Sequence, residues 1–187
     1  MSIADDVVSD YILRHQEAAA KELRWFEIQR SLGDAVSLAA LAKGPGGKRL
    51  AHQRRIPRRV LGECRRRLVG SLDDLRGARS FEDLHDVVAA TIGPIRGIGP
   101  LTIYDTSLRV GANLGLEPEQ VFLHAGTRVG ARRLGLDVAR TAVPVEELPQ
   151  PLWRLRPREI EDVLCIYKDR LGRDRSGLWR DPSSGRG

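Results

Sequence analysis

The chain has 187 residues but only two cysteines, Cys64 and Cys165. Two thiols exclude a multi-disulfide scaffold, a four-cysteine zinc site and a cysteine-held iron–sulfur cluster. Aromatic residues make up 5% of the sequence, and no apolar run reaches the roughly 18 residues that a membrane-spanning helix needs. Asp5 and Asp6 stand where a signal peptide would carry basic residues. These absences predict a cytoplasmic protein that has no membrane partner.

Segments of helical period alternate with glycines and prolines, and strand-like alternation is scarce. This pattern predicts an all-α fold in one compact helical domain. We expect a first long helix from about Asp5 to Leu32 that Gly33 ends. Composition further predicts five regions: an N-terminal helical segment at 1–42, a basic loop and helix at 43–70, a core at 80–137, a proline-rich link with a C-terminal helix packed on the core at 138–171, and a flexible tail at 172–187.

Basic residues are concentrated between residues 43 and 70. This segment holds ten lysines and arginines against one acidic residue, Glu63, although the net charge of the whole chain is only +6. Pro57 suits the first turn of a helix with one apolar side and one cationic side. A solvated helix face would carry the same pattern, but so large an excess favours contact with phosphate groups. The arginines expected to form this basic surface are Arg54, Arg55, Arg58, Arg59, Arg65, Arg66 and Arg67.

A second informative segment, Ile92–Gly115, contains closely spaced glycines followed at once by a helical pattern. Gly97 and Gly99 allow positive φ and close approach of another backbone, and we expect Ile98 between them to point inward. Pro100 suits the first turn of the helix that follows. Free amides at this helix start would form an anion site of phosphate size.

This segment resembles the helix-hairpin-helix motif of DNA repair proteins, with Val87–Ile95 as the end of the first helix, Arg96–Gly99 as the hairpin and Pro100–Leu114 as the second helix. The resemblance implies that the hairpin binds the backbone of duplex DNA without reading its sequence. It also implies a monovalent cation at the hairpin carbonyls as the sole candidate cofactor. The implied phosphate-binding residues are Arg96, Gly97, Ile98, Gly99 and Thr102.

The chain is also similar to the endonuclease III-like DNA glycosylases over about residues 80–137. The pattern RV…RLGL, from Arg128 to Leu136, looks like the one that follows the hairpin in those enzymes. Their catalytic aspartate matches Leu123 and His124 here, and their lysine nucleophile matches Leu101. The resemblance therefore implies the fold and DNA binding with a degenerate catalytic signature. Glu119 and His124 are the remaining candidates for catalysis, while His124 also fits a structural role at a helix start.

Three functions stay open at this point. The first is a sequence-nonspecific DNA-binding protein of DNA repair or processing, and the second is a divergent glycosylase or another base-flipping enzyme. The third is a scaffold that binds RNA or an acidic protein. The four histidines show no pair at metal-ligand spacing, so we expect no metal site. The residue pattern indicates no oligomeric state.

Overall fold

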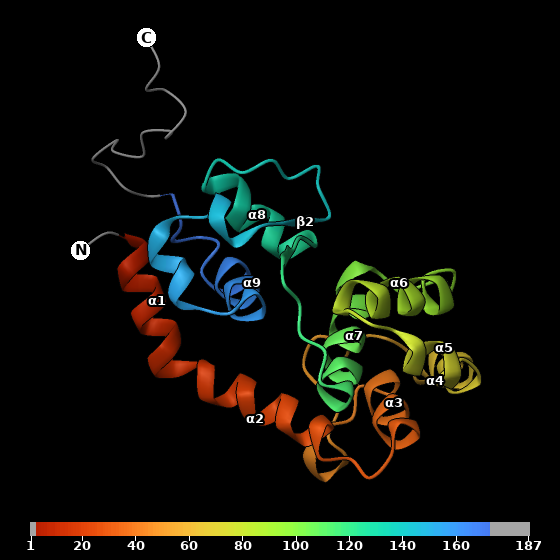
Figure 1. Cartoon of the computed structure of the whole chain (residues 1–187). Helices are drawn as coiled ribbons and strands as arrows, with labels where there is room; N and C mark the ends of the chain where they lie inside the picture. Colours follow the sequence, from red (N-terminus) through yellow and green to blue (C-terminus); the bar gives the residue numbers. More distant parts are fainter. Residues whose placement is uncertain (1–2, 173–187) are drawn as a thin grey trace.

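A computed structural model describes residues 3–172 (Figure 1). The described chain is mostly helical, with one two-stranded sheet, which confirms the predicted fold class in its broad form. The predicted tail lies, apart from Gly172, outside the described residues. In the sheet, Val121 pairs with Val143 and Phe122 with Ala142 in antiparallel register. The elements in chain order are α1 (Ile3–Arg14), α2 (Gln16–Glu27), α3 (Leu32–Ala40), η1 (Pro45–Gly47), α4 (Arg58–Gly70), α5 (Leu72–Gly77), α6 (Phe81–Ile92), α7 (Pro100–Leu114), β1 (Val121–Phe122), α8 (Ala125–Arg133), β2 (Ala142–Val143), η2 (Val145–Glu147), η3 (Gln150–Arg154) and α9 (Pro157–Ile166).

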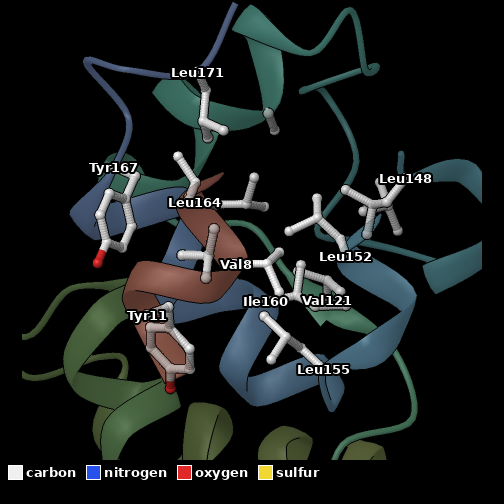
Figure 2. Close-up of a cluster of buried hydrophobic side chains, with 14 of the residues drawn as sticks. Val8, Tyr11, Val121, Leu148, Leu152, Leu155, Ile160, Leu164, Tyr167 and Leu171 are labelled. Carbon is white, nitrogen blue, oxygen red and sulfur yellow. The ribbon is translucent and has the colours of Figure 1, made fainter. Parts of the chain in front are cut away.

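Buried apolar side chains form two large clusters, and α2 runs from one group of helices to the other (Figure 1). The first cluster, the C-terminal core, brings α1 together with α8, α9 and the short sheet. Figure 2 shows Val8 and Tyr11 of α1 packed among side chains of the last third of the chain, including Ile160 and Leu164 of α9. Helix α1 is therefore held by η3 and by α9, the last helix of the described residues.

The second cluster, the hairpin core, consists of α3, α4, α5, α6, α7 and the end of α2. Phe26 anchors α2 in it, and Cys64 and Leu68 anchor α4, all of them fully buried or nearly so. A small third cluster of Phe81, Tyr104 and Phe122 stacks three rings edge to face or tilted. These rings connect α6 and α7 to β1.

The prediction of one long first helix is wrong. The chain turns at His15 and divides the segment into α1 and α2. Gly33 does not end a helix either, because it lies in the first turn of α3. Ser31 is the N-cap of α3, and its hydroxyl accepts a hydrogen bond from the Asp34 amide at 3.1 Å. The helix-start signal of Ser31 therefore outweighs the helix-stop signal of the glycine.

The predicted pair of helices around Gly97 has nearly the expected bounds. Ser80 caps α6, since its hydroxyl accepts from the Asp83 amide at 3.0 Å. The helix ends at Ile92, slightly earlier than predicted, and α7 begins at Pro100 as predicted. The connecting turn, residues 93–99, thus has ordered helices on both sides.

The C-terminal helix expected within 138–171 begins at Pro157, since proline suits the first turn of a helix. It ends at Ile166 rather than at Leu171, and the last described residues continue as turns. Among residues 3–172, no helix combines the length and the apolar character needed to cross a membrane.

Candidate functional site

The basic segment folds into a groove lined by six cationic side chains and by no acidic one. This basic groove lies between the end of α3 and the start of α4, and its cations are Lys43, Lys48, Arg49, Arg54, Arg55 and Arg58. Within residues 3–172 none of the six forms an ion pair with a carboxylate. Uncompensated cations in a concave surface make a focused positive potential.

The loop that carries these cations is held by its own hydrogen bonds. An antiparallel bridge joins Lys43 to Arg49, and Gly46 and Gly47 adopt positive φ between them. The Arg49 guanidinium donates to the carbonyls of Gln53 and Ile56 at 3.0 and 3.1 Å. The cationic side chains therefore project from a loop of defined shape.

A second, shallower hollow connects the groove to turn 93–99. It shares Pro57 with the groove and adds Arg59 and Glu63 of α4 together with Arg96 and Gly97 of the turn. Arg96 and Gly97 are exposed. The basic segment and the glycine-rich turn, predicted separately from the sequence, therefore line the same hollow.

The turn itself has the backbone conformation that its glycines suggest. Gly97 has φ of +98°, and Gly99 is the extended N-cap of α7. Ile98 is half-buried against the hairpin core, and its amide donates to the Ile95 carbonyl at 3.0 Å. Among the described residues, neither the Gly97 nor the Gly99 amide has a hydrogen-bond acceptor. Two free donors thus stand next to the positive end of the α7 dipole.

Thr102 lies one turn further along α7 and is 9% exposed. The Thr106 hydroxyl donates back to the Thr102 carbonyl at 2.7 Å and is 2% exposed, so Thr106 does not join the turn amides. The assignment of Arg96, Gly97, Ile98, Gly99 and Thr102 to phosphate binding stays a prediction.

The expected basic surface divides into three parts. Arg54, Arg55 and Arg58 line the basic groove, and Arg59 lines the hollow beside it. Arg66 and Arg67 instead bind the Glu63 carboxylate, both at 2.7 Å. The structure gives Arg65 an exposed position on α4 outside both hollows. Because an ion-paired arginine offers less free charge to an anion, the groove is the stronger candidate for phosphate contact.

A different feature, not predicted from the sequence, is a polar cavity between the two cores. Three helices line it with side chains spaced as i, i+3 and i+4, and the loop at 50–52 completes it. The lining residues are Ala19, Glu22 and Leu23 of α2, Asp105, Leu108 and Arg109 of α7, Arg158, Glu161 and Asp162 of α9, and Leu50, Ala51 and His52 of the loop. Its volume is about 130 Å³. Each helix turns charged residues inward, where charges are rare unless they are paired.

Asp105 is the centre of the network on one side of the cavity. Its carboxylate accepts from His52 Nδ1 at 3.0 Å and from Gln53 Nε2 at 2.5 Å, and Arg109 lies 3.6 Å away. Arg109 in turn contacts Glu22 at 3.2 Å. Burial acts to raise the pKa of Asp105, but the Arg109 charge and the two hydrogen bonds outweigh it, so the net pKa is lowered. The hydrogen bond to Asp105 raises the pKa of His52.

Glu161, on the other side of the cavity, is in the opposite state. It is buried, and its Oε1 makes a short hydrogen bond with Nε2 of His124. Burial raises the pKa of Glu161 to about 7, although the contact with His124 opposes this shift. The adjacent Asp162 also has a raised pKa because of burial, and it accepts a hydrogen bond from the Tyr11 hydroxyl at 2.8 Å. The cavity therefore combines an ionised carboxylate, Asp105, with a carboxyl group, Glu161, that titrates near neutral pH.

The raised pKa of Glu161 predicts a loss of stability as the pH rises. The folded protein binds this proton up to about pH 7, whereas the unfolded chain releases it near pH 4.5. Stability that is present below pH 4.5 is thus lost between pH 4.5 and 7. Relative to Glu161→Gln, which cannot ionise, the wild type should lose about 3 kcal/mol of unfolding free energy over this window. Urea unfolding of both proteins from pH 4.5 to 8 measures the difference, and parallel profiles would contradict the assignment.

The two catalytic candidates, Glu119 and His124, have different surroundings. Glu119 is exposed, whereas His124 is 2% exposed and bound to Glu161. His124 is also the N-cap of α8, where its amide donates to the Thr127 hydroxyl at 2.7 Å. Its structural role at a helix start is therefore confirmed. Glycosylase chemistry at either residue stays a hypothesis.

Among the described residues, no group of three or more histidine, cysteine or acidic side chains is arranged to hold a metal ion. Comparisons with protein-family models, curated proteins and solved structures found no match to this chain.

Proposed function

We propose that this protein binds DNA through its phosphate backbone, without reading base sequence, and acts in DNA repair or processing. The observation that carries the proposal is the basic groove, in which six lysine and arginine side chains face one concavity and no carboxylate faces it. Phosphate contacts of this kind provide most of the affinity of sequence-independent binding. Arginine, which dominates the groove, also binds phosphate in a bidentate manner.

The turn at 93–99 supports the same function as a helix-hairpin-helix element. Gly97, whose amide is free, lines a hollow that shares Pro57 with the groove, and Gly99 with its free amide and the start of α7 follow directly in the chain. A DNA backbone that follows the groove would reach these donors next. The groove would supply charge, and the turn would fix one phosphate by hydrogen bonds.

Salt dependence of duplex binding tests the proposal. If the six groove cations each neutralise one phosphate, the slope of log K against log salt concentration should be about −5. A fluorescently labelled duplex of mixed sequence, titrated between 50 and 300 mM salt, measures it. Duplex RNA and an acidic peptide of equal charge serve as comparison ligands. No binding of the DNA duplex at the lowest salt concentration would reject the proposal, and preference for the peptide would favour a scaffold.

A pair of glycine variants separates the turn's shape from its contact with phosphate. Gly99 has φ of −119°, and a Cβ there meets nothing within 4 Å, so Gly99→Ala should leave stability unchanged. Gly97→Ala should lower the unfolding free energy by about 1 kcal/mol because of its positive φ. A methyl group at residue 99 would occupy the open space through which a phosphate approaches the Gly99 amide, so Gly99→Ala should weaken duplex binding about tenfold, the cost of one lost hydrogen bond. Unchanged affinity with Gly99→Ala would show that the turn is not in the interface.

A further inference from the structure

Gln53, in the loop that carries the groove cations, is the only buried residue between residues 45 and 60, with 2% of its surface exposed. Its neighbours on both sides, His52 and Arg54, are exposed. Because the buried side chain is polar, it needs hydrogen bonds in place of the water that it loses. The loop is therefore held to the body of the protein at this point by the partners of one amide group.

Both ends of the Gln53 amide bind helix α7. Its Nε2 donates to Asp105 Oδ2 at 2.5 Å, and its Oε1 accepts from Arg109 at 3.2 Å. A carboxylate only accepts and a guanidinium only donates, so these partners fix the orientation of the amide. His52 lies 3.0 Å from the same Asp105 oxygen. Among the described residues, these are the only side-chain hydrogen bonds that join the loop at 43–57 to another element.

The backbone of Gln53 connects these contacts to the basic groove. Its carbonyl accepts from the groove cation Arg49 at 3.0 Å and from the Ile56 amide at 3.1 Å. The next two residues along the chain, Arg54 and Arg55, line the groove. A shift of Gln53 would therefore move three of the six groove cations together.

Helix α7 also carries the other candidate phosphate contact. Its N-cap is Gly99, whose amide is free, and Asp105 lies in the second turn of the same helix. At about 1.5 Å per residue, the two are about 9 Å apart along the helix axis. The helix is continuous between them, so Asp105 moves with the turn at 93–99. The contact of Gln53 with Asp105 thus fixes the spacing between the groove and the turn.

We propose that Gln53 is a positioning residue for phosphate binding, which holds the groove arginines and the turn at 93–99 at the spacing that lets both contact one DNA backbone. This inference rests on the proposed DNA binding and deepens it. Two contacts at a fixed spacing bind as a bivalent unit, because the first contact places the second at a high effective concentration. A loop that is free to shift would have to be ordered on binding, which lowers affinity.

Gln53→Met removes the hydrogen bonds while keeping the net charge and nearly the length of the side chain. It should weaken binding of the labelled mixed-sequence duplex about tenfold. All six groove cations remain, so the slope of log K against log salt concentration should stay at about −5. Gln29→Met, which removes a bond to the Trp25 carbonyl outside the groove, is the matched control and should bind as the wild type does. Equal affinity of folded Gln53→Met and wild type would overturn the proposal.

A double-mutant cycle separates positioning from a general loss of stability. Gly99→Ala should weaken duplex binding about tenfold in the wild type but only about two- to threefold in Gln53→Met, where the turn and the groove no longer engage together. Destabilisation of the fold alone would leave the two effects additive. Additive effects on log K would therefore contradict positioning by Gln53.

Exchange of the amide and the carboxylate tests the hydrogen bond itself. Gln53→Glu places two carboxylates at this contact and should weaken duplex binding. Gln53→Glu/Asp105→Asn restores one amide, one carboxylate and the net charge of the wild type, and Arg109 lies 3.2 and 3.6 Å from the two positions. The double variant should bind within about threefold of the wild type. If Gln53→Met does not fold, this pair decides, and a folded double variant without recovery rejects the proposal.

The wild type separates this inference from the proposed function. If the wild type does not bind the duplex at the lowest salt concentration, the proposed function fails, and positioning by Gln53 fails with it. If the wild type binds and folded Gln53→Met binds equally well, DNA binding stands and only the positioning role is lost.

Discussion

The triple variant Arg54→Ala/Arg55→Ala/Arg58→Ala should lose about two to three orders of magnitude in affinity for duplex DNA at 0.1 M salt. The three arginines line the basic groove and form no ion pair among the described residues. Each phosphate contact that is removed also means that fewer counterions are released on binding. The slope of log K against log salt concentration should therefore become shallower by nearly three. Titrations of the labelled duplex at three or more salt concentrations measure both quantities.

A control with the same change of net charge distinguishes the groove from overall charge. Arg30, Arg132 and Arg154 are exposed, lie outside the groove and have no ion-pair partner in the part of the chain that the structure describes. Their replacement by alanine should change affinity only slightly, because contacts beyond a Debye length of about 8 Å are screened at physiological salt. If both triple variants lose affinity equally, the protein attracts DNA by net charge and the groove is not its binding site.

The extent to which the sequence predicts this structure differs between local and long-range features. Ser80, Gly97 and Pro100 act on their own neighbours through capping, positive φ and restricted φ, and the predicted turn between α6 and α7 agrees with the structure. Gly33 was misleading because a stronger local signal, the hydroxyl of Ser31, lies two residues before it. Turn and cap residues therefore predict the local structure correctly where no competing cap residue lies within a few positions.

The polar cavity could not be predicted in the same way. Asp105 with Arg109, and Arg158 with Asp162, have the i, i+4 spacing of ordinary exposed ion pairs on a helix. Only packing between distant segments makes them buried, as in the contact between Tyr11 and Asp162, which are 151 residues apart in sequence. His124 was a candidate on its own, but its partner Glu161 lies 37 residues further along. One feature of the sequence does indicate such a cavity: helices of a small domain carry charged residues on faces that the apolar pattern predicts to be buried.

Helix α2 and the loop between α3 and α4 explain why the basic groove and the polar cavity lie close together. The loop between α3 and α4 has its cations in the basic groove, while His52 and Gln53 of the same loop bind Asp105 beside the cavity. Phe26 at the end of α2 fixes the hairpin core to which this loop belongs, and Glu22 one turn earlier reaches Arg109. The buried network is thus part of what holds the loop in place.

Arg109→Leu should consequently be the most destabilising substitution in this network. The side chain is 4% exposed and contacts Glu22, Gln53 and Asp105. Leucine is apolar like the arginine stem but shorter, and it leaves the Asp105 carboxylate, itself 7% exposed, without its cation. Removal of one partner of a buried ion pair costs about 3 to 5 kcal/mol. Urea unfolding at pH 7 measures the loss, and a cost near that of an exposed pair, below about 1 kcal/mol, would show that solvent screens the network.

The pH dependence of this variant tests the mechanism rather than the size of the effect. In the wild type the pKa of Asp105 is lowered below 3.8, so its contribution to stability is present above that pH and is lost as the pH falls through the folded-state pKa. Without Arg109 the largest of the contributions that lower the pKa is gone, so the folded-state pKa of Asp105 is higher in the variant than in the wild type. The difference in stability between the two proteins should therefore shrink as the pH falls through the pKa of the variant. Arg109→Leu/Asp105→Asn, which removes the charge, should recover about 1 kcal/mol or more at pH 7 and lose this convergence. A double variant no more stable than Arg109→Leu would mean that Arg109 acts through its packing on Phe26, 5.8 Å from the ring centre, and not through the charge of Asp105.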